Sequence, residues 1–374
     1  MDRDGYSFGI EEEFFLSCPK TGTLVNHAAP DLLHSARRRL GDAVTCEMLE
    51  SQIEIVSPVF KHVAEASLMM GELRRALAEV AAAHELRLIA AGTHPLGVWH
   101  EQRVTDRPRY EHLMKDFRIV GHRNLVCGLH VHVAVPQHAD RIDIMNRAVR
   151  WLPLFLALST SSPFWNGRAT GLLSYRQALY DEWPRSGLPD FFENESDYTA
   201  FIERMQSAGA IRDASQLWWA IRPAARFPTL ELRIADACTR VQDSVALASL
   251  FRCLVAALVR NPALGAQRTT HTRRIVDENR WRAKRDGIQA RFIAQASNDA
   301  TPATEVLDGL LTVVSAEAEK LDCGHVLQSL QLILDRGTSA HEQLRIYEEM
   351  RTAGESRAAA LGAVVKWLEC ATVL

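Results

Sequence analysis

Residues 127–135 read CGLHVHVAV and place two histidines, His130 and His132, on alternate positions of an otherwise apolar run. Side chains of a β-strand alternate between the two faces of a sheet, so both imidazoles point to the same side. The intervening positions are leucine and valine, which point to the other side. The stretch therefore predicts a strand with one apolar face and one face that carries imidazole groups.

Three other stretches show the same division into an apolar and a polar set of alternate positions. They lie within residues 6–16, 47–58 and 229–236. Their polar positions are Gly9, Glu11 and Glu13, then Glu50, Gln52 and Glu54, then Thr229, Glu231 and Arg233. Strands of this kind are typical of an antiparallel sheet whose second face meets water.

The polar face is unusual because its acids are five glutamates and no lysine lies among them. If the strands are neighbours, the carboxylates repel one another and raise one another's pKa values. A divalent cation removes that repulsion, and several carboxylates with one imidazole suit Mg²⁺ or Mn²⁺ better than zinc. Because Mg²⁺ held by carboxylates usually keeps positions for substrate phosphates, the polar face predicts ATP chemistry.

The common nucleotide and hydrolase motifs do not occur in the chain. Neither G-x-x-x-x-G-K-[ST] nor G-x-G-x-x-G is present, which argues against a P-loop or a Rossmann site. H-E-x-x-H and G-x-S-x-G are also missing, so a zinc peptidase and an α/β-hydrolase are disfavoured. An ATP site would have to be built on the sheet face, from metals and arginines.

The composition is that of an ordinary globular protein of 374 residues, 47% hydrophobic and 24% charged, with a net charge of −3. This balance indicates neither a nucleic-acid surface nor a membrane-facing one. We expect no run long enough to cross a bilayer, and the N-terminus lacks the layout of a signal peptide. Seven scattered cysteines without a C-x-x-C pair indicate free thiols in a reducing cytoplasm.

The order of predicted elements favours one α+β domain over residues 1–374, with an all-helical region from about 270 to 374. Amphipathic or apolar helices are expected at residues 30–41, 63–84, 140–164 and 243–262. Pro153 is a candidate kink in the third of these helices, and Asp243 is a candidate N-cap of the fourth.

The ordered set of motifs resembles one known family. The motifs are GIEEEFFL, ESQIEIVSP, AAGTHPLGVW, CGLHVHVAVP, LLSYRQALYDEWPRSGLP, WWAIRP, TLELRIAD and ENRWRAKRDG. In sequence and order they resemble the bacterial carboxylate–amine ligase family, which is related to glutamate–cysteine ligase and often called glutamate–cysteine ligase type 2. Each motif alone is weak, but the ordered set covers most of the chain.

The resemblance implies a curved, mainly antiparallel sheet like the catalytic core of glutamine synthetase, with helices on one face. It implies ATP and a divalent metal, Mg²⁺ or Mn²⁺, on the concave face of a single catalytic domain. It also implies amide-bond formation through an acyl phosphate, with glutamate and cysteine as the default substrates. A cytoplasmic homodimer that acts on a small-molecule acid and amine, without nucleic acid or membrane, is the matching expectation for partners.

The resemblance also assigns roles to individual positions. The implied metal ligands are Glu11, Glu13, Glu50, Glu54, His130 and Glu231. Arg233 of the E-x-R motif and Arg176 of SYR match arginines expected near the transferred phosphoryl group or the acid substrate. Arg222 of IRP is a further candidate there. Arg280 and Arg285 of ENRWRAKRDG are candidates for contacts with nucleotide phosphates, and a solvated or salt-bridged helix face is the alternative for either.

Three positions depart from the family pattern. Ala220 stands where the family usually has aspartate, Ala134 where glycine commonly ends HVHVG, and Pro228 where glycine precedes TxExR. The metal-bearing positions are intact. Ala220 bears more on substrate identity, because it removes a polar side chain beside the predicted site.

In the reaction that we expect, the substrate carboxylate attacks the γ-phosphate of metal-bound ATP, and an amine then displaces phosphate. Arg233 and Arg176 stabilise the transferring phosphoryl group as fixed planar donors. Residues 170–189, rich in glycine and proline, either close over the site to exclude water or form a static surface loop. His132 is interpreted as a hydrogen-bonding partner within the sheet, and Glu12 as a paired acid on the apolar side.

Two other functional classes stay open. A metal-dependent ATP hydrolase or phosphotransferase would use the same face without an amine. A catalytically silent protein that binds a nucleotide or an amino acid would keep binding without releasing ADP. The residues themselves do not define which acid and amine are joined, nor the number of metal ions.

Overall fold

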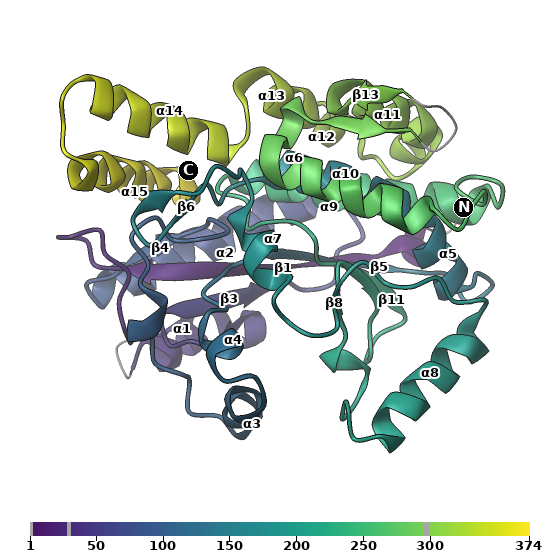
Figure 1. The fold of residues 1–374 in the computed structure, drawn as a ribbon, viewed down its shortest axis with the longest axis horizontal. Helices are drawn as coiled ribbons and strands as arrows, with labels where there is room; N and C mark the ends of the chain where they lie inside the picture. The colour runs from purple at the N-terminus through teal and green to yellow at the C-terminus, as the bar shows by residue number, and fades with distance from the viewer. Residues whose placement is uncertain (1–2, 28–30, 295–298) are drawn as a thin grey trace.

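The computed structural model describes residues 3–27, 31–294 and 299–374. Within them, the main sheet has seven antiparallel strands in the order β10-β11-β5-β1-β3-β2, and β4 also pairs with β1. The strands are β1 (Phe8–Ser17), β2 (Val44–Cys46), β3 (Gln52–Val56), β4 (Arg87–Ile89), β5 (Leu129–Ala134), β10 (Ile221–Pro223) and β11 (Thr229–Leu232). Figure 1 shows β1 crossing the middle of the molecule.

The register of the sheet confirms the predicted alternation and brings the polar positions together. Glu13 of β1 pairs with Glu54 of β3, and Glu11 pairs with His130 of β5. His132 of β5 in turn pairs with Glu231 of β11. Because paired residues of an antiparallel sheet point to the same side, these six side chains share one face.

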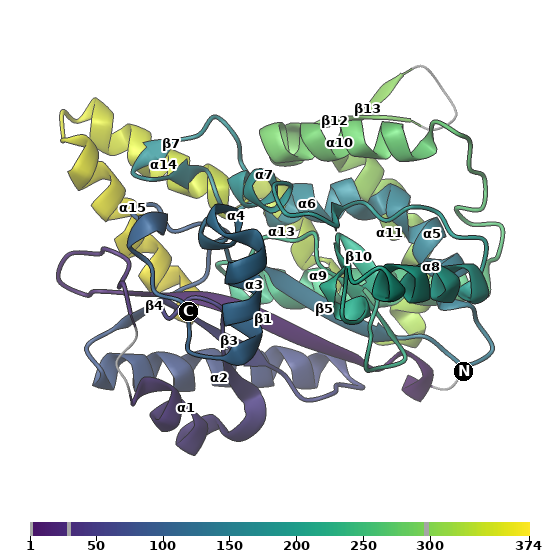
Figure 2. The same ribbon diagram turned by 60° about the horizontal axis from the view of Figure 1, so that its bottom comes forward.

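The helices cover both sides of this sheet. They are α1 (Leu32–Leu40), α2 (Val63–Ala83), α3 (Pro108–Phe117), α4 (Ile119–His122), α5 (Arg141–Ala148), α6 (Leu152–Ser159), α7 (Tyr175–Tyr180), α8 (Glu195–Ser207), α9 (Val241–Arg260), α10 (Thr272–Asp286), α11 (Ala303–Lys320), α12 (Gly324–Leu327), α13 (Ser329–Arg336), α14 (Ser339–Thr352) and α15 (Arg357–Val373). Figure 2 shows α1 and α2 on one side of β1 and β3, and α7 and α10 on the other.

The apolar face of the sheet forms the core with α2 and α9, which contact each other and the strands. One charged pair is embedded there. Glu12 points into this face, as predicted, and its carboxylate accepts hydrogen bonds of 2.7 and 2.8 Å from Arg74 of α2. Arg74 also donates to the main-chain carbonyls of Cys238, Thr239 and Thr372, so every charge in this region has a partner of opposite polarity.

Helix α9 corrects one expectation about the chain. Taken alone, it is long and apolar enough to cross a bilayer, although no such run was predicted. All its residues except Gln242, Val259 and Arg260 are buried within the protein. The helix is therefore explained by burial on all sides in the core.

Several element boundaries also differ from the sequence prediction. The helix expected at 140–164 is divided into α5 and α6 by a 3₁₀ turn at Val149–Trp151, and Pro153 lies in the first turn of α6, where its missing N–H costs little. Asp243 does not cap α9, since Arg240 is the N-cap residue and Asp243 binds Arg336 instead.

Short strand pairs lie outside the main sheet. They are β6 (Phe164–Trp165) with β7 (Arg168–Ala169), β8 (Ser186–Gly187) with β9 (Trp218–Trp219), and β12 (Arg291–Ile293) with β13 (Ala300–Pro302). The last pair interrupts the region that was predicted to be entirely helical. The segment 170–189, predicted as a loop, contains α7 and one strand of the second pair.

Candidate active site

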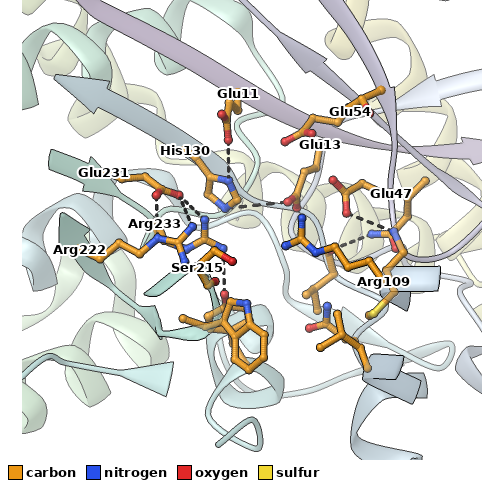
Figure 3. Close-up of a pocket in the computed structure, with 18 of the residues that line it drawn as sticks. Glu11, Glu13, Glu47, Glu54, Arg109, His130, Ser215, Arg222, Glu231 and Arg233 are labelled. Atoms are coloured by element: carbon orange, nitrogen blue, oxygen red, sulfur yellow. Dashed lines mark hydrogen bonds and ion pairs between the residues drawn. The ribbon is translucent and has the colours of Figure 1, made fainter. Parts of the chain in front are cut away.

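The polar face of the sheet forms the floor of a pocket of about 400 Å³. One wall comes from the segment after β2 and from α3, the other from α7 and the segment before β10. Figure 3 shows carboxylates, His130 and arginines from these separate elements pointing into the same space. The polar residues that strand alternation placed on one face thus share the pocket with residues from the surrounding loops and helices.

Three groups of side chains in the pocket have the geometry of a metal site. In each group the candidate ligand atoms lie within 4.8 Å of one another. The groups are Glu11, Glu54 and His130; Glu11, His132 and Glu231; and Glu13, Glu47 and Glu54. Glu11 and Glu54 each belong to two groups, so adjacent cations could share a carboxylate.

The carboxylates of the all-carboxylate group oppose one another's ionisation. Burial, together with the neighbouring carboxylates, raises the pKa of Glu54 well above its ordinary range. Burial and the charge of Glu13 raise the pKa of Glu47 to about 8. The main-chain N–H of Gly128 fixes Glu13 through a 2.6 Å hydrogen bond. Three carboxylates held together against burial and mutual repulsion are the ligand set that a hard divalent cation takes.

The two histidines lie on either side of Glu11. His130 Nδ1 is 3.5 Å from one Glu11 oxygen, and His132 Nε2 is 3.4 Å from the other. Burial and the charge of Arg233 lower the pKa of His130. Burial also acts to lower the pKa of His132, but Glu11 and Glu231 outweigh it and raise that pKa. Burial likewise raises the pKa of Glu11, and hydrogen bonds with the two histidines outweigh it and hold that pKa below its ordinary value.

His132 combines the two roles that were considered for it. Its Nδ1 lies 3.0 Å from the Thr229 hydroxyl, which is the predicted hydrogen bond within the sheet. Its Nε2 nevertheless faces Glu11 and Glu231 and belongs to a candidate metal group. Strand alternation placed His132 on the same face as His130, and it was a better guide to the position of His132 than the purely structural role assigned to that residue.

Two arginines share the carboxylate of Glu231. Arg222 donates to it through Nε at 2.7 Å and through Nη2 at 3.2 Å, and Arg233 donates to it through Nη1. Burial opposes ionisation of Glu231, but Arg233 and Arg222 hold its pKa well below the ordinary value. Two guanidinium groups share one carboxylate, so this wall of the pocket has a net positive charge, which attracts phosphate groups.

Arg176 reaches the pocket through the space that Gly128 leaves free. A Cβ atom on Gly128 would lie 2.2 Å from Arg176 Nη2, so a larger residue would displace the guanidinium group. Arg176 is 1% exposed, and its Nη1 atom lies 4.0 Å from the Asp236 carboxylate. Its hydrogen bonds to the carbonyls of Arg233 and Ile234 are long, 3.4 and 3.5 Å.

Three predicted site residues lie elsewhere. Glu50 does not line the pocket, because a turn closed by the Gln52 N–H and the Leu49 carbonyl precedes β3 and ends the alternation. Arg280 does not line it either and binds Asp181 and Asp277. Arg285 is exposed and binds Asp286. The geometry therefore does not support the ligand and phosphate roles predicted for these three residues.

Several pocket residues were missed from the sequence. They are Glu47, Arg109, Tyr180 and Ser215. Glu47 opens the predicted strand at 47–58, where strict alternation assigns it to the apolar side with Leu49, and the turn before β3 breaks that alternation. Ala220 is buried and does not line the pocket, so a direct substrate contact at that position has no support.

Comparisons with known proteins agree with this geometry. The model of the family described as glutamate–cysteine ligase family 2 (GCS2) matches residues 7–361. A relative from Ectopseudomonas mendocina (strain ymp), provisionally named glutamate–cysteine ligase 2, is 43% identical over 98% of this chain and 97% of its own length. A similarly named relative from Rhodospirillum rubrum is 40% identical over 100% of this chain and 97% of its own length.

Solved structures share the fold at low sequence identity. Glutamate–cysteine ligase from Francisella tularensis, crystallised with AMP, has a TM-score of 0.72 and 12% identity, covering 99% of this chain and 89% of that one. A bifunctional glutathione synthetase from Pasteurella multocida has a TM-score of 0.69 and 16% identity over 98% of this chain. The present chain spans 53% of that longer protein.

Proposed function

Because the chain belongs to glutamate–cysteine ligase family 2, and is therefore an ATP-dependent carboxylate–amine ligase, we propose that its pocket joins glutamate to cysteine through an acyl phosphate. The choice of these two substrates follows from the names of its relatives. The observation that supports the reaction is the division of the pocket into a carboxylate cluster and an arginine wall. This is the arrangement that a metal-bound polyphosphate requires.

The carboxylate cluster fits a divalent cation, for which we propose Mg²⁺ or Mn²⁺. The residues that would hold it are Glu11, Glu13, Glu47, Glu54, His130, His132 and Glu231. Oxygen-rich sites of this kind favour these ions over zinc. When bound, such ions neutralise charge on the phosphates of ATP.

The arginine wall would act on the transferred group. Arg233 and Arg222 lie at the edge of the carboxylate cluster, where the γ-phosphate of a metal-bound ATP would meet them. A substrate carboxylate oxygen attacks the γ-phosphorus and ADP leaves, and the amine then attacks the acyl carbon and phosphate leaves. Rigid guanidinium groups stabilise the negative charge that develops on the phosphoryl oxygens without having to reorganise.

Mg²⁺-dependent ADP release tests this proposal. The assay contains glutamate, and amines are added one at a time, beginning with cysteine. Release that needs both acid and amine, with a condensed product detected by mass, supports the ligase. Release without any amine would indicate an ATP hydrolase or phosphotransferase, and binding of ATP without release would indicate a silent binding protein.

The setting of the enzyme is also proposed. We infer one catalytic domain, because a single hydrophobic cluster contains residues from Tyr6 to Ile333. All seven cysteines are free thiols, which favours a reducing cytoplasm. The homodimer and the independence from nucleic acid and membrane rest on the sequence alone, and light scattering of the purified protein tests the first of these.

A further inference from the structure

Helix α7 carries Tyr180 to a position between the two pocket arginines. The Tyr180 hydroxyl accepts a 3.1 Å hydrogen bond from Arg233 Nη2. The guanidinium carbon of Arg176 lies 5.3 Å from the centre of the Tyr180 ring. One side chain therefore contacts Arg233 through its polar end and Arg176 through its aromatic face.

Both arginines have little else to fix them. Within the part of the chain that the structure describes, the Nε atoms of Arg176 and Arg233 are buried without a hydrogen-bond partner. Apart from the Tyr180 ring, the Arg176 guanidinium has the long carbonyl contacts described above and the carboxylate of Asp236 at 4.0 Å. Arg233 is otherwise bound to Glu231, which Arg222 also holds. The Tyr180 hydroxyl thus limits where the Arg233 guanidinium can lie.

Helix α7 has only six residues and is held in place from two sides. On one side Gln177 Nε2 donates to the carbonyl of Ile234 at 2.8 Å, and the Ser174 hydroxyl donates to Asp236 at 2.8 Å. These contacts attach α7 to the chain segment directly after Arg233. The helix is therefore held against the segment that follows strand β11 and begins at Arg233.

On the other side, Asp181 attaches the end of α7 to helix α10. Its carboxylate accepts from Arg280 Nη1 at 2.5 Å and from Lys284 Nζ at 2.6 Å. Both cations are nearly buried, at 7% and 6% exposure. Figures 1 and 2 both show α7 beside α10, and the two helices are in contact. The two cations are nearly buried while Asp181 is partly exposed, and together the three residues tie the end of α7 to α10.

We propose that Tyr180 is a positioning residue for the transfer step, which holds Arg233 and Arg176 in place while Asp181, Arg280 and Lys284 fix the helix that carries it. This inference rests on the proposed function of the pocket. It gives Arg280 a role through Asp181 and Tyr180 instead of through contact with nucleotide phosphates. It also makes residues 174–181 a fixed wall of the pocket and not a closing lid.

The variant Tyr180→Phe tests the inference, because it removes the hydroxyl and keeps the ring. We expect kcat about tenfold lower, since a hydrogen bond to a charged group is lost, with KM for ATP and for the acid within about twofold. Tyr175→Phe is the matched control on the same helix, because among the described residues its hydroxyl has no recorded hydrogen bond and it does not line the pocket. A wild-type kcat in Tyr180→Phe would overturn the proposal.

Arg280→Met separates the indirect role from a direct one. If Arg280 acts through Asp181, kcat falls roughly threefold while KM for ATP is unchanged, and Lys284→Met behaves alike. If Arg280 touches the nucleotide, KM for ATP rises and kcat does not change, which contradicts the inference. Thermal melting of each variant within about 2 °C of wild type excludes loss of fold as the cause.

A structural readout keeps the inference testable if the proposed function fails. Crystal structures of wild type and Tyr180→Phe are compared without any assay. A displaced or poorly ordered Arg233 in the variant supports the positioning role of Tyr180, even if wild type forms no amide bond. An Arg233 that is unmoved in the variant overturns it, whatever the activity of wild type.

Discussion

Consecutive glutamates of strand β1 have different kinds of partner on the two faces of the central sheet. Glu12 enters the apolar face, and a fork of hydrogen bonds from Arg74 neutralises it there. Glu11 and Glu13 enter the polar face, where no lysine or arginine forms an ion pair with either among the described residues. The buried charge of Glu12 is matched by the chain itself, whereas Glu11 and Glu13 have no such arginine partner among the same residues and are left for a ligand to match.

The largest effect should come from removing a carboxylate of the polar face. In Glu54→Gln we expect Mg²⁺-dependent ADP release to fall by about three orders of magnitude or more, because two candidate metal groups lose a ligand. Steady-state ADP release measures this. Glu50→Gln is the matched control, and its activity should stay near wild type because Glu50 lies outside the pocket. Equal losses in both variants would refute the placement of these acids.

On the apolar face, the largest effect should be on stability. In Arg74→Met we expect the free energy of unfolding to fall by about 3–5 kcal/mol, because Glu12 is left charged and buried without a partner. Urea denaturation measures the change. The double variant Glu12→Gln with Arg74→Met should recover part of it, since the uncompensated charge is then gone. No recovery would mean that the loss came from packing and not from charge.

Metal addition should sharpen the contrast between the faces. At a Mg²⁺ concentration about a hundredfold above its dissociation constant, the wild-type free energy of unfolding should rise by about 2.7 kcal/mol. In Glu54→Gln the increase should be much smaller, while in the Glu12→Gln/Arg74→Met variant it should persist. Urea titrations with and without Mg²⁺, with EDTA as the metal-free reference, give these numbers. An equal gain in Glu54→Gln would place the metal elsewhere.

The smallest predicted effect concerns the glycine that admits Arg176. Gly128→Ala should lower kcat by roughly tenfold, because the added Cβ meets the Arg176 guanidinium. Gly309→Ala is the control, since Gly309 is an exposed position of helix α11 and an added Cβ meets nothing within 4 Å. It should leave kcat unchanged and add about 0.5–1 kcal/mol of stability. A Gly128→Ala enzyme as fast as wild type would show that Arg176 does not act at its observed position.

Sequence reasoning was strongest where strand alternation is uninterrupted. In β1, β5 and β11 the period of two assigned each polar residue to the correct face, and the pairing register then joined Glu11, His130 and Glu231. The sheet and the family could be predicted for the same reason, because ordered motifs mark these strands.

The same reasoning failed where a local turn or the packing of a distant helix determines the direction of a side chain. A turn before Gln52 ends the alternation, so Glu50 leaves the face and Glu47 enters the pocket from the preceding segment. Arg280 is directed to Asp181 by the packing of α10 on α7, which no local pattern encodes. The sequence also could not tell the buried helix α9 from a membrane helix, because apolar surroundings of either kind select the same residues.

The hydrogen bond from Arg74 to the carbonyl of Thr372 joins residues 298 positions apart. Thr372, in helix α15, also accepts from the N–H of Ala90 beside strand β4 through its hydroxyl. During synthesis, Arg74, the partner of Glu12, cannot form all its hydrogen bonds until α15 has left the ribosome. The strand that carries Glu11 and Glu13 is therefore tied, through Glu12 and Arg74, to a helix far along the chain, and contacts of such sequence separation are slow to form in folding.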